Sequence, residues 1–139
     1  MDIPKLLQHV FGQLNANNID LLDQVYADNI QFEDPAHKLD GLLNFKSYCR
    51  NLYQNVTICT FNFKNISYFE GGAILEWDML LQHPKLNRGK KFTVPGISVI
   101  HYRDKIYSHR DYFDLGVMLY ERLPLIGWLI RIIKRKLGQ

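Results

Sequence analysis

The residues best suited to chemistry lie together near the end of the sequence, in the segment from Ile106 to Asp114. As a β-strand, this segment would place alternate side chains on opposite faces, so His109 and Asp111 would share one face. An imidazole beside a carboxylate can hold or transfer a proton. Two interpretations remain open. In one, Arg110 forms a structural ion pair with Asp111 or Asp114. In the other, His109 and Asp111 form the wall of a pocket.

A second candidate acid, Asp34, ends a segment of alternating apolar and polar residues that runs from Asn29 to Asp34 and stops at Pro35. Asp34 is in line with the apolar residues of this predicted strand. It is either a turn residue, which the adjacent proline favours, or an acid in a pocket. The sequence predicts that Asp34, His109 and Asp111 form one coupled proton-transfer site.

Helices and strands that would position these residues are indicated by hydrophobic periodicity. Apolar residues recur at helical spacing from Ile3 to Leu14, and Asn18 is placed to cap a second short helix whose inner side includes Val25 and Tyr26. A third helix follows Gly41. From Val56 the period changes to two, and turn residues divide the chain into four expected antiparallel strands: Val56–Phe69, Ala73–Gln82, Lys91–Arg103 and Lys105–Asp114. Gly96 removes side-chain bulk where the sheet must bend or a ligand must approach.

Composition narrows the class of protein. A chain of 139 residues, 47% hydrophobic and 22% charged, is typical of one globular domain. The net charge of +3 is too small to indicate a nucleic-acid partner. Cys49 and Cys59 have no metal-ligand spacing, so we expect free thiols, and with no signal peptide visible we expect a cytoplasmic protein. Phosphate-loop, dinucleotide, serine-triad and zinc patterns are missing, so we expect no cofactor and no metal.

The segment from Leu115 to Gln139 reads as a helix interrupted near Pro124. Apolar residues crowd between Leu123 and Ile133, and the basic residues Arg131, Lys134, Arg135 and Lys136 lie at its end. This apolar run is shorter than the ~20 residues that span a bilayer. Two interpretations remain open: the helix packs on the sheet or in a homodimer interface, or it lies with Trp128 at the inner face of the membrane as a peripheral anchor.

Three local segments carry a family resemblance: Tyr26–Asn29 followed by Phe32–Pro35, Gly41 opening a helix that contains Tyr48, and Asp111–Asp114. With the order of helices and strands, they resemble the nuclear-transport-factor-2-like superfamily. The resemblance implies an α+β fold in which a cone-shaped, curved antiparallel sheet and N-terminal helices enclose a cavity. Residues 1–114 would form this domain, and residues 115–139 would add a C-terminal helix.

The resemblance also implies roles for individual residues. The segment around Asp34 is similar to that of bacterial ketosteroid isomerases, in which the aspartate before proline is the base that shuttles a proton. The closing strand resembles that of SnoaL-like polyketide cyclases, which implies an acid or base at His109 or Asp111. The isomerases' two oxyanion-hole residues correspond to Val10 and Ser98 here. We therefore expect an isomerase or cyclase without the full isomerase oxyanion hole.

The expected cavity is mostly apolar and aromatic, and its ligand-binding residues would be Phe32, Phe45, Tyr48, Trp77, Met79, Ser98 and Phe113. Such a cavity suits a small hydrophobic carbonyl or polyene compound. Two alternatives from other classes remain open. One is a noncatalytic module that binds a hydrophobic ligand or lipid, and the other is a structural homodimer whose cavity has lost its use.

Overall fold

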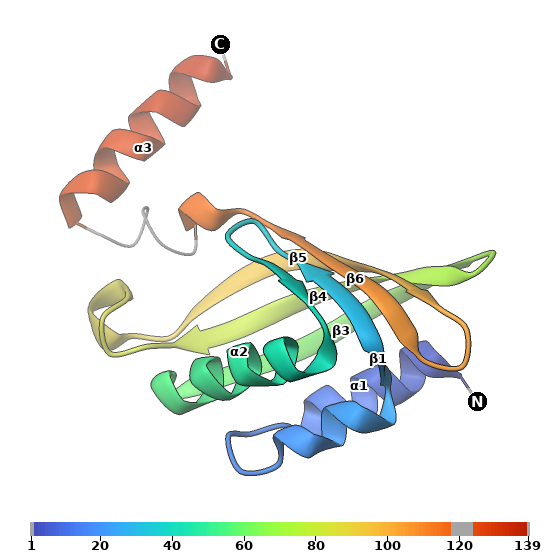
Figure 1. Cartoon of the computed structure of the whole chain (residues 1–139). Coiled ribbons are helices and arrows are strands. Elements are labelled where there is room, and N and C mark those ends of the chain that lie inside the picture. The colour runs from blue at the N-terminus through green and yellow to red at the C-terminus, as the bar shows by residue number, and fades with distance from the viewer. Residues whose placement is uncertain (1, 118–123, 139) are drawn as a thin grey trace.

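A curved, six-stranded mixed sheet forms the body of the protein in the computed structural model, which describes residues 2–117 and 124–138 (Figure 1). The elements in chain order are α1 (Ile3–Gln13), the 3₁₀ helix η1 (Ile19–Gln24), β1 (Tyr26–Glu33), β2 (Lys38–Asp40), α2 (Leu42–Asn55), β3 (Ile58–Phe69), β4 (Gly72–Gln82), the 3₁₀ helix η2 (Asn87–Gly89), β5 (Phe92–Tyr102), β6 (Ile106–Phe113) and α3 (Pro124–Leu137). The strand order β2-β1-β6-β5-β4-β3 leaves the sheet open, and α1 and α2 lie against the same face of it. The predicted α+β class is confirmed.

The four strands predicted after residue 55 are present with ends that differ by at most two residues, and each pairs with the next in antiparallel fashion. β1 departs from the predicted antiparallel pattern because it pairs with β6 in parallel, with Phe32 opposite His109. Some seventy residues of chain join these two strands, so no tight turn imposes an antiparallel direction. The parallel pair sets the end of β1 beside the closing strand.

The predicted second short helix is present as the 3₁₀ helix η1, with Asn18 at its N-cap position, but two details of the prediction were wrong. The Asn18 side chain does not cap the helix and bonds instead to the backbone at Asn15 and Gln13. Tyr26 begins β1 instead of ending the helix, three residues before the predicted strand. The Ile106 amide donates to the Val25 carbonyl at 2.9 Å, so pairing with β6 draws this part of the chain into the sheet.

A short strand that was not predicted, β2, folds back on β1 after Pro35 and leads into α2. Gly41 sits at the start of α2 with φ of 88°, a conformation that favours glycine. Its amide donates to the Ile30 carbonyl at 2.7 Å. This contact fixes where α2 leaves the sheet, and therefore which side chains of α2 reach the interior.

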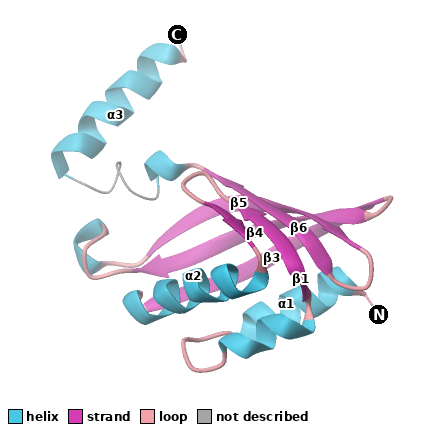
Figure 2. Cartoon of the chain, in the orientation of Figure 1, coloured by secondary structure: helices cyan, strands magenta, loops and turns pink. Residues whose placement is uncertain are grey.

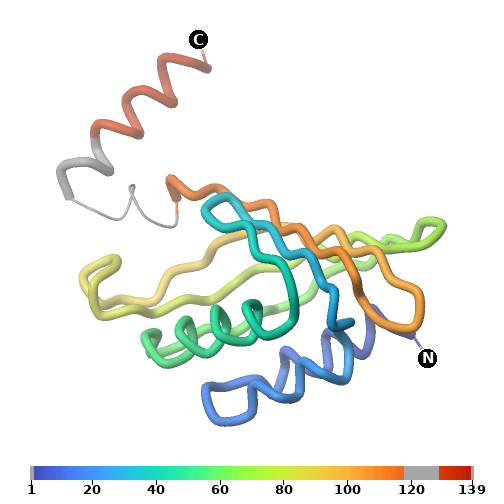
Figure 3. Tube along the Cα trace, viewed as in Figure 1, coloured from blue at the N-terminus to red at the C-terminus, as the bar shows by residue number. Residues whose placement is uncertain are grey.

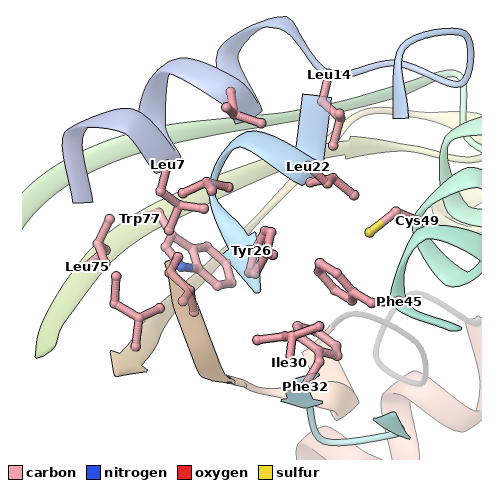
Figure 4. Close-up of a cluster of buried hydrophobic side chains, with 14 of the residues drawn as sticks. Leu7, Leu14, Leu22, Tyr26, Ile30, Phe32, Phe45, Cys49, Leu75 and Trp77 are labelled. Carbon is pink, nitrogen blue, oxygen red and sulfur yellow. The ribbon is translucent and has the colours of Figure 1, made fainter. Parts of the chain in front are cut away.

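The core fills the space between the concave face of the sheet and the helices (Figure 4). Its fully buried members include Leu7, Val10, Leu22, Tyr26, Ile30, Phe45, Leu75, Trp77 and Ile100. Gly96 lies directly against the Trp77 indole, where an added Cβ would approach the ring to 2.4 Å. The bulk removed at Gly96 is therefore taken up by Trp77, and not by a ligand.

The C-terminal helix α3 stands apart from the sheet and the other helices, as Figures 2 and 3 show. Lys134 on α3 forms an ion pair of 2.9 Å with Asp114, which directly follows β6. The predicted interruption falls at the start of α3, since Pro124 is its first residue. Leu123 and the side chains of residues 124–128, including Trp128, lie outside the described part of the structure. No helix among the described residues is long and apolar enough to cross a membrane.

Candidate active site

A pocket of about 110 Å³ lies between α2 and the concave face of the sheet. Its predicted lining residues are Phe32, Asp34, Phe45, Tyr48, Trp77, Met79, His109, Asp111 and Phe113, and it is also lined by Phe11, Ala36, His37, Cys49, Leu52, Tyr53, Phe61 and Leu81. Ser98 instead borders a smaller adjoining pocket, where its hydroxyl contacts the indole N–H of Trp77 and the Asp111 carboxylate. The three predicted acid-base residues thus face one mostly apolar pocket.

His109 and Asp111 project from the same face of β6, as the strand period predicts. His109 Nε2 lies 2.6 Å from Asp111 Oδ1, and the Ser98 hydroxyl donates to the same oxygen at 2.5 Å. The Trp77 indole N–H donates in turn to the Ser98 hydroxyl at 2.8 Å. His109 and Ser98 are both buried, so this part of the site is held rigidly.

The second nitrogen of His109, Nδ1, lies 2.8 Å from the Tyr26 hydroxyl. Burial raises the pKa of Tyr26 well above its ordinary value of 10.0, so the phenol keeps its proton and donates to Nδ1. The network then assigns the ring proton of neutral His109 to Nε2, which donates to Asp111. Asp111 Oδ1 therefore accepts hydrogen bonds from both Ser98 and His109. Among the described residues, none donates to Asp111 Oδ2.

Asp34 closes the turn between β1 and β2. Its Oδ1 accepts from the amides of Ala36 and His37 at 2.8 and 2.7 Å, and its own amide donates to the His37 carbonyl. The structure therefore supports the turn interpretation of Asp34. The carboxylate is also buried and borders the pocket, so Asp34 is a turn residue that lies at the pocket wall.

Two side chains complete the surroundings of Asp34. The Tyr48 hydroxyl donates to Oδ2 at 2.8 Å, and burial together with the Asp34 charge raises the pKa of Tyr48, which keeps its proton. His37 Nδ1 lies 3.1 Å from Oδ1. No described residue forms a hydrogen bond with His37 Nε2. The His37 ring lines the pocket and is about half exposed.

The ion-pair interpretation of Arg110 does not describe this strand. Arg110 points away from the pocket and pairs with Glu33 at 3.2 Å, while Asp114 pairs with Lys134. Adjacent strand residues face opposite sides of the sheet, so Arg110 cannot reach its neighbour Asp111. The geometry agrees with the other interpretation, in which His109 and Asp111 form part of the pocket wall.

Three polar residues of the site were not predicted from the sequence: Tyr26, His37 and Tyr53. The Asp-Pro sequence at Asp34 is a turn signal that could have indicated His37, because such turns return the chain to the aspartate. Tyr26 had no such signal, since its partner His109 is 83 residues away. Tyr53 could have been identified from helical spacing, because it lies four residues after Cys49 and eight after Phe45 on the pocket side of α2.

The Tyr53 hydroxyl is buried, and among the described residues it has no hydrogen-bond partner of its own. The thiol of Cys59 lies beside it, and burial raises the pKa of Tyr53. Buried hydroxyls without a partner are rare and call for an explanation. Since Tyr53 borders the pocket, a bound molecule could accept its hydrogen bond.

Both cysteines are free thiols, as the sequence predicts, and both are buried. Burial raises the pKa of Cys49 far above its ordinary value and that of Cys59 to about 12. A thiol is reactive as the thiolate, which burial disfavours here. Cys49 therefore contributes a small apolar surface to the pocket and not a nucleophile.

Comparisons with known proteins agree with this fold. Residues 7–109 match the family model described as a SnoaL-like domain. A protein from Catenulispora acidiphila with a ketosteroid isomerase-like fold, solved with trimethylamine, is 14% identical with a TM-score of 0.73, covering 87% of this chain and 91% of that one. A candidate SnoaL-like polyketide cyclase from Shewanella putrefaciens is 15% identical with a TM-score of 0.68, covering 82% and 90%. No curated protein sequence gave a significant match.

Proposed function

Because the chain belongs to the SnoaL-like domain family, we propose that it is an acid-base catalyst of the isomerase or cyclase type. Its substrate is a small, largely apolar carbonyl or polyene compound. The structural neighbour from Shewanella putrefaciens is named a candidate polyketide cyclase, which supports this class of reaction. The observation that carries the proposal is the position of Asp111, a carboxylate in a mostly apolar pocket with one oxygen to which no described residue donates.

Asp111 is the general base of the proposed reaction. Hydrogen bonds from Ser98 and His109 fix Oδ1, and Oδ2 receives no donor from the described residues. A fixed carboxylate in an apolar pocket can take a proton from a carbon next to a carbonyl group. His109 and Ser98 position the carboxylate, and the Tyr26 hydroxyl holds His109 in the tautomer that does so.

Asp34 acts through its partners in this proposal. Two amides, the His37 ring and the Tyr48 hydroxyl already surround its oxygens, so little of its accepting capacity is left for a substrate. By accepting from Nδ1 of His37, it leaves Nε2 as the ring nitrogen that can exchange a proton with a ligand. His37 takes a proton from solvent at Nε2, since its ring is about half exposed, and in this protonated form it can pass that proton to the substrate at the edge of the pocket.

Tyr53 orients the substrate. Among the described residues, its buried hydroxyl has only the Cys59 thiol beside it, a weak hydrogen-bonding group, so it can donate to an oxygen of the bound molecule. A pocket of about 110 Å³ suits a compound of about one ring, since a cavity of ~150 Å³ accommodates benzene. The substrate class is therefore a small cyclic or folded compound with at least one carbonyl or hydroxyl oxygen.

Proton abstraction can be tested without knowing the natural substrate. The protein is incubated in D₂O with a panel of small cyclic ketones and enones, and deuterium incorporation next to the carbonyl is followed by mass spectrometry. The wild type should accelerate incorporation for at least one compound. Asp111→Asn preserves the acceptors for Ser98 and His109 but removes the base, so the rate should fall by ~10² to 10⁴.

A matched control is Asp78→Asn, which neutralises a carboxylate that pairs with Lys64 on the other face of the sheet. This variant should exchange at the wild-type rate. An acceleration that survives Asp111→Asn would refute the assignment of the base.

The pocket's apolar walls favour a second function, binding of a small hydrophobic molecule without catalysis. This function predicts that a ketone from the panel quenches the fluorescence of Trp77, which borders the pocket, while no deuterium is incorporated. Tight binding without exchange would replace the catalytic proposal with this one.

A further inference from the structure

The helix α3 presents a row of exposed apolar side chains. Leu129, Ile133 and Leu137 are 52%, 50% and 82% exposed. They are spaced four residues apart, so they lie on one side of the helix and form a continuous stripe. Large apolar side chains gathered on a surface indicate a site of interaction.

The same helix is strongly basic. Arg131, Lys134, Arg135 and Lys136 follow one another within two turns, and the sequence contains no acidic residue from Pro124 onward. Three of these residues, Arg131, Lys134 and Arg135, are spaced so that they share the side opposite the apolar stripe. The helix is therefore amphipathic, with an apolar side, a cationic side and no compensating negative charge of its own.

The position of α3 leaves both sides accessible. Figure 1 shows the helix projecting from the body of the protein beyond the end of β6. Lys134 is joined there to Asp114, and Phe113, the residue before it, borders the pocket. This ion pair joins the last turns of the amphipathic helix to the end of β6, next to a residue that lines the candidate active site.

We propose that α3 binds the surface of an anionic lipid bilayer. The stripe Leu129, Ile133 and Leu137 enters the boundary between headgroups and acyl chains, and the basic residues interact with the anionic headgroups. Charge complementarity favours this partner over a second copy of the chain, because two α3 helices would bring like charges together. The helix lies in the plane of the surface, since it is too short to span the bilayer.

Flotation with vesicles tests this inference on the full-length protein. We expect binding to phosphatidylcholine vesicles that contain about one-third phosphatidylglycerol, and little binding to phosphatidylcholine alone. Binding should weaken as salt is raised. Arg135→Gln combined with Lys136→Gln should lower the affinity roughly tenfold or more, from the ~1 kcal/mol that each basic residue contributes near such a surface. Leu129→Gln combined with Ile133→Gln should abolish binding.

The matched control is Leu43→Gln, which changes a leucine that is 81% exposed on α2 and should leave vesicle binding unchanged. All these positions are exposed, so the variants should fold, and circular dichroism verifies it. The inference is overturned if the wild type ignores anionic vesicles. It is also overturned if the α3 variants bind as the wild type does, or if they change only the oligomeric state in size-exclusion chromatography. The deuterium-exchange experiment is independent of this result, so the two proposals fail separately.

Discussion

The pocket contains two pairs of histidine and aspartate, and the two pairs differ in which atom they leave available. In the pair His109 and Asp111, both imidazole nitrogens form hydrogen bonds, and one carboxylate oxygen receives none from the described residues. In the pair His37 and Asp34, the carboxylate is surrounded by donors, and the imidazole has one nitrogen without a described partner. The same two side-chain types are thereby suited to opposite roles, a carboxylate base in the first pair and, when the His37 ring is protonated, an imidazolium acid in the second.

The difference arises from where the fold puts each pair. His109 and Asp111 lie on β6, a central strand with neighbours on both sides, so the histidine side chain is only 5% exposed. Asp34 and His37 lie in the turn that follows β1, and the His37 side chain is 47% exposed. The contrast lies in the histidines, since His109 is enclosed by the sheet and His37 is open to solvent, whereas the carboxylates of Asp34 and Asp111 are only 4% and 15% exposed.

The largest expected effect concerns access of water to the buried side of the pocket. Cys49 borders it, Cys59 lies nearby, and burial raises the pKa of both thiols. A thiol with a pKa of about 12 instead of 9.0 has roughly 10³-fold less thiolate at neutral pH. Ellman's reagent should therefore label the native protein at least that much more slowly than the urea-unfolded protein. Equal labelling rates would show that this side of the pocket is open.

The next largest effect should be on stability. His109→Gln leaves the buried Tyr26 hydroxyl without its acceptor, so the free energy of unfolding should fall by about 2 to 4 kcal/mol. His37→Gln, the matched change in the other pair, should cost less than about 1 kcal/mol because the ring is half exposed. Urea denaturation measures both. If the two variants lose the same stability, the contrast between an enclosed and an open histidine does not hold.

A smaller effect distinguishes the pairs at alkaline pH. The folded protein raises the pKa of Tyr26, so the unfolded chain releases this proton near pH 10 while the folded protein keeps it. The stabilisation is complete below pH 10 and is lost as pH rises above it, by about 1.4 kcal/mol per pH unit.

Tyr26→Phe removes this contribution. The slope of unfolding free energy against pH, measured by urea denaturation above about pH 10, should be shallower than in the wild type by that amount. Identical slopes would mean that Tyr26 ionises equally in both states, contrary to its burial.

The sequence predicted the site residues on β6, His109 and Asp111, better than it predicted Tyr26, which forms a hydrogen bond with His109. Period two along β6 placed His109 and Asp111 on one face, because that relation depends only on local geometry. Tyr26 was assigned to a helix because its spacing from Ile19 and Leu22 also fits one. Only the parallel pairing with β6, a contact between distant segments, decides for the strand.

Asp34 illustrates the same limit. Its identity as a turn residue follows from Pro35, but the contacts of its carboxylate depend on where α2 brings Tyr48. The position of α2 depends in turn on the hydrogen bond between Gly41 and Ile30. Such contacts between elements leave no periodic signal in the sequence. The division into residues 1–114 and 115–139 and the expected homodimer stay predictions.

The parallel contact between β1 and β6 has a consequence for how the molecule acquires its site. The Tyr26 and His109 side chains are separated by 83 positions along the chain, whereas β3, β4, β5 and β6 are joined successively by short connections. Local hairpins form readily, but a contact across most of the chain carries the entropic cost of closing a long loop. The four strands from β3 to β6 can therefore assemble first. The hydrogen bonds that link Tyr26, His109 and Asp111 are complete only once β1 pairs with β6. A nascent chain would remain chemically incompetent until its closing strand had been synthesised.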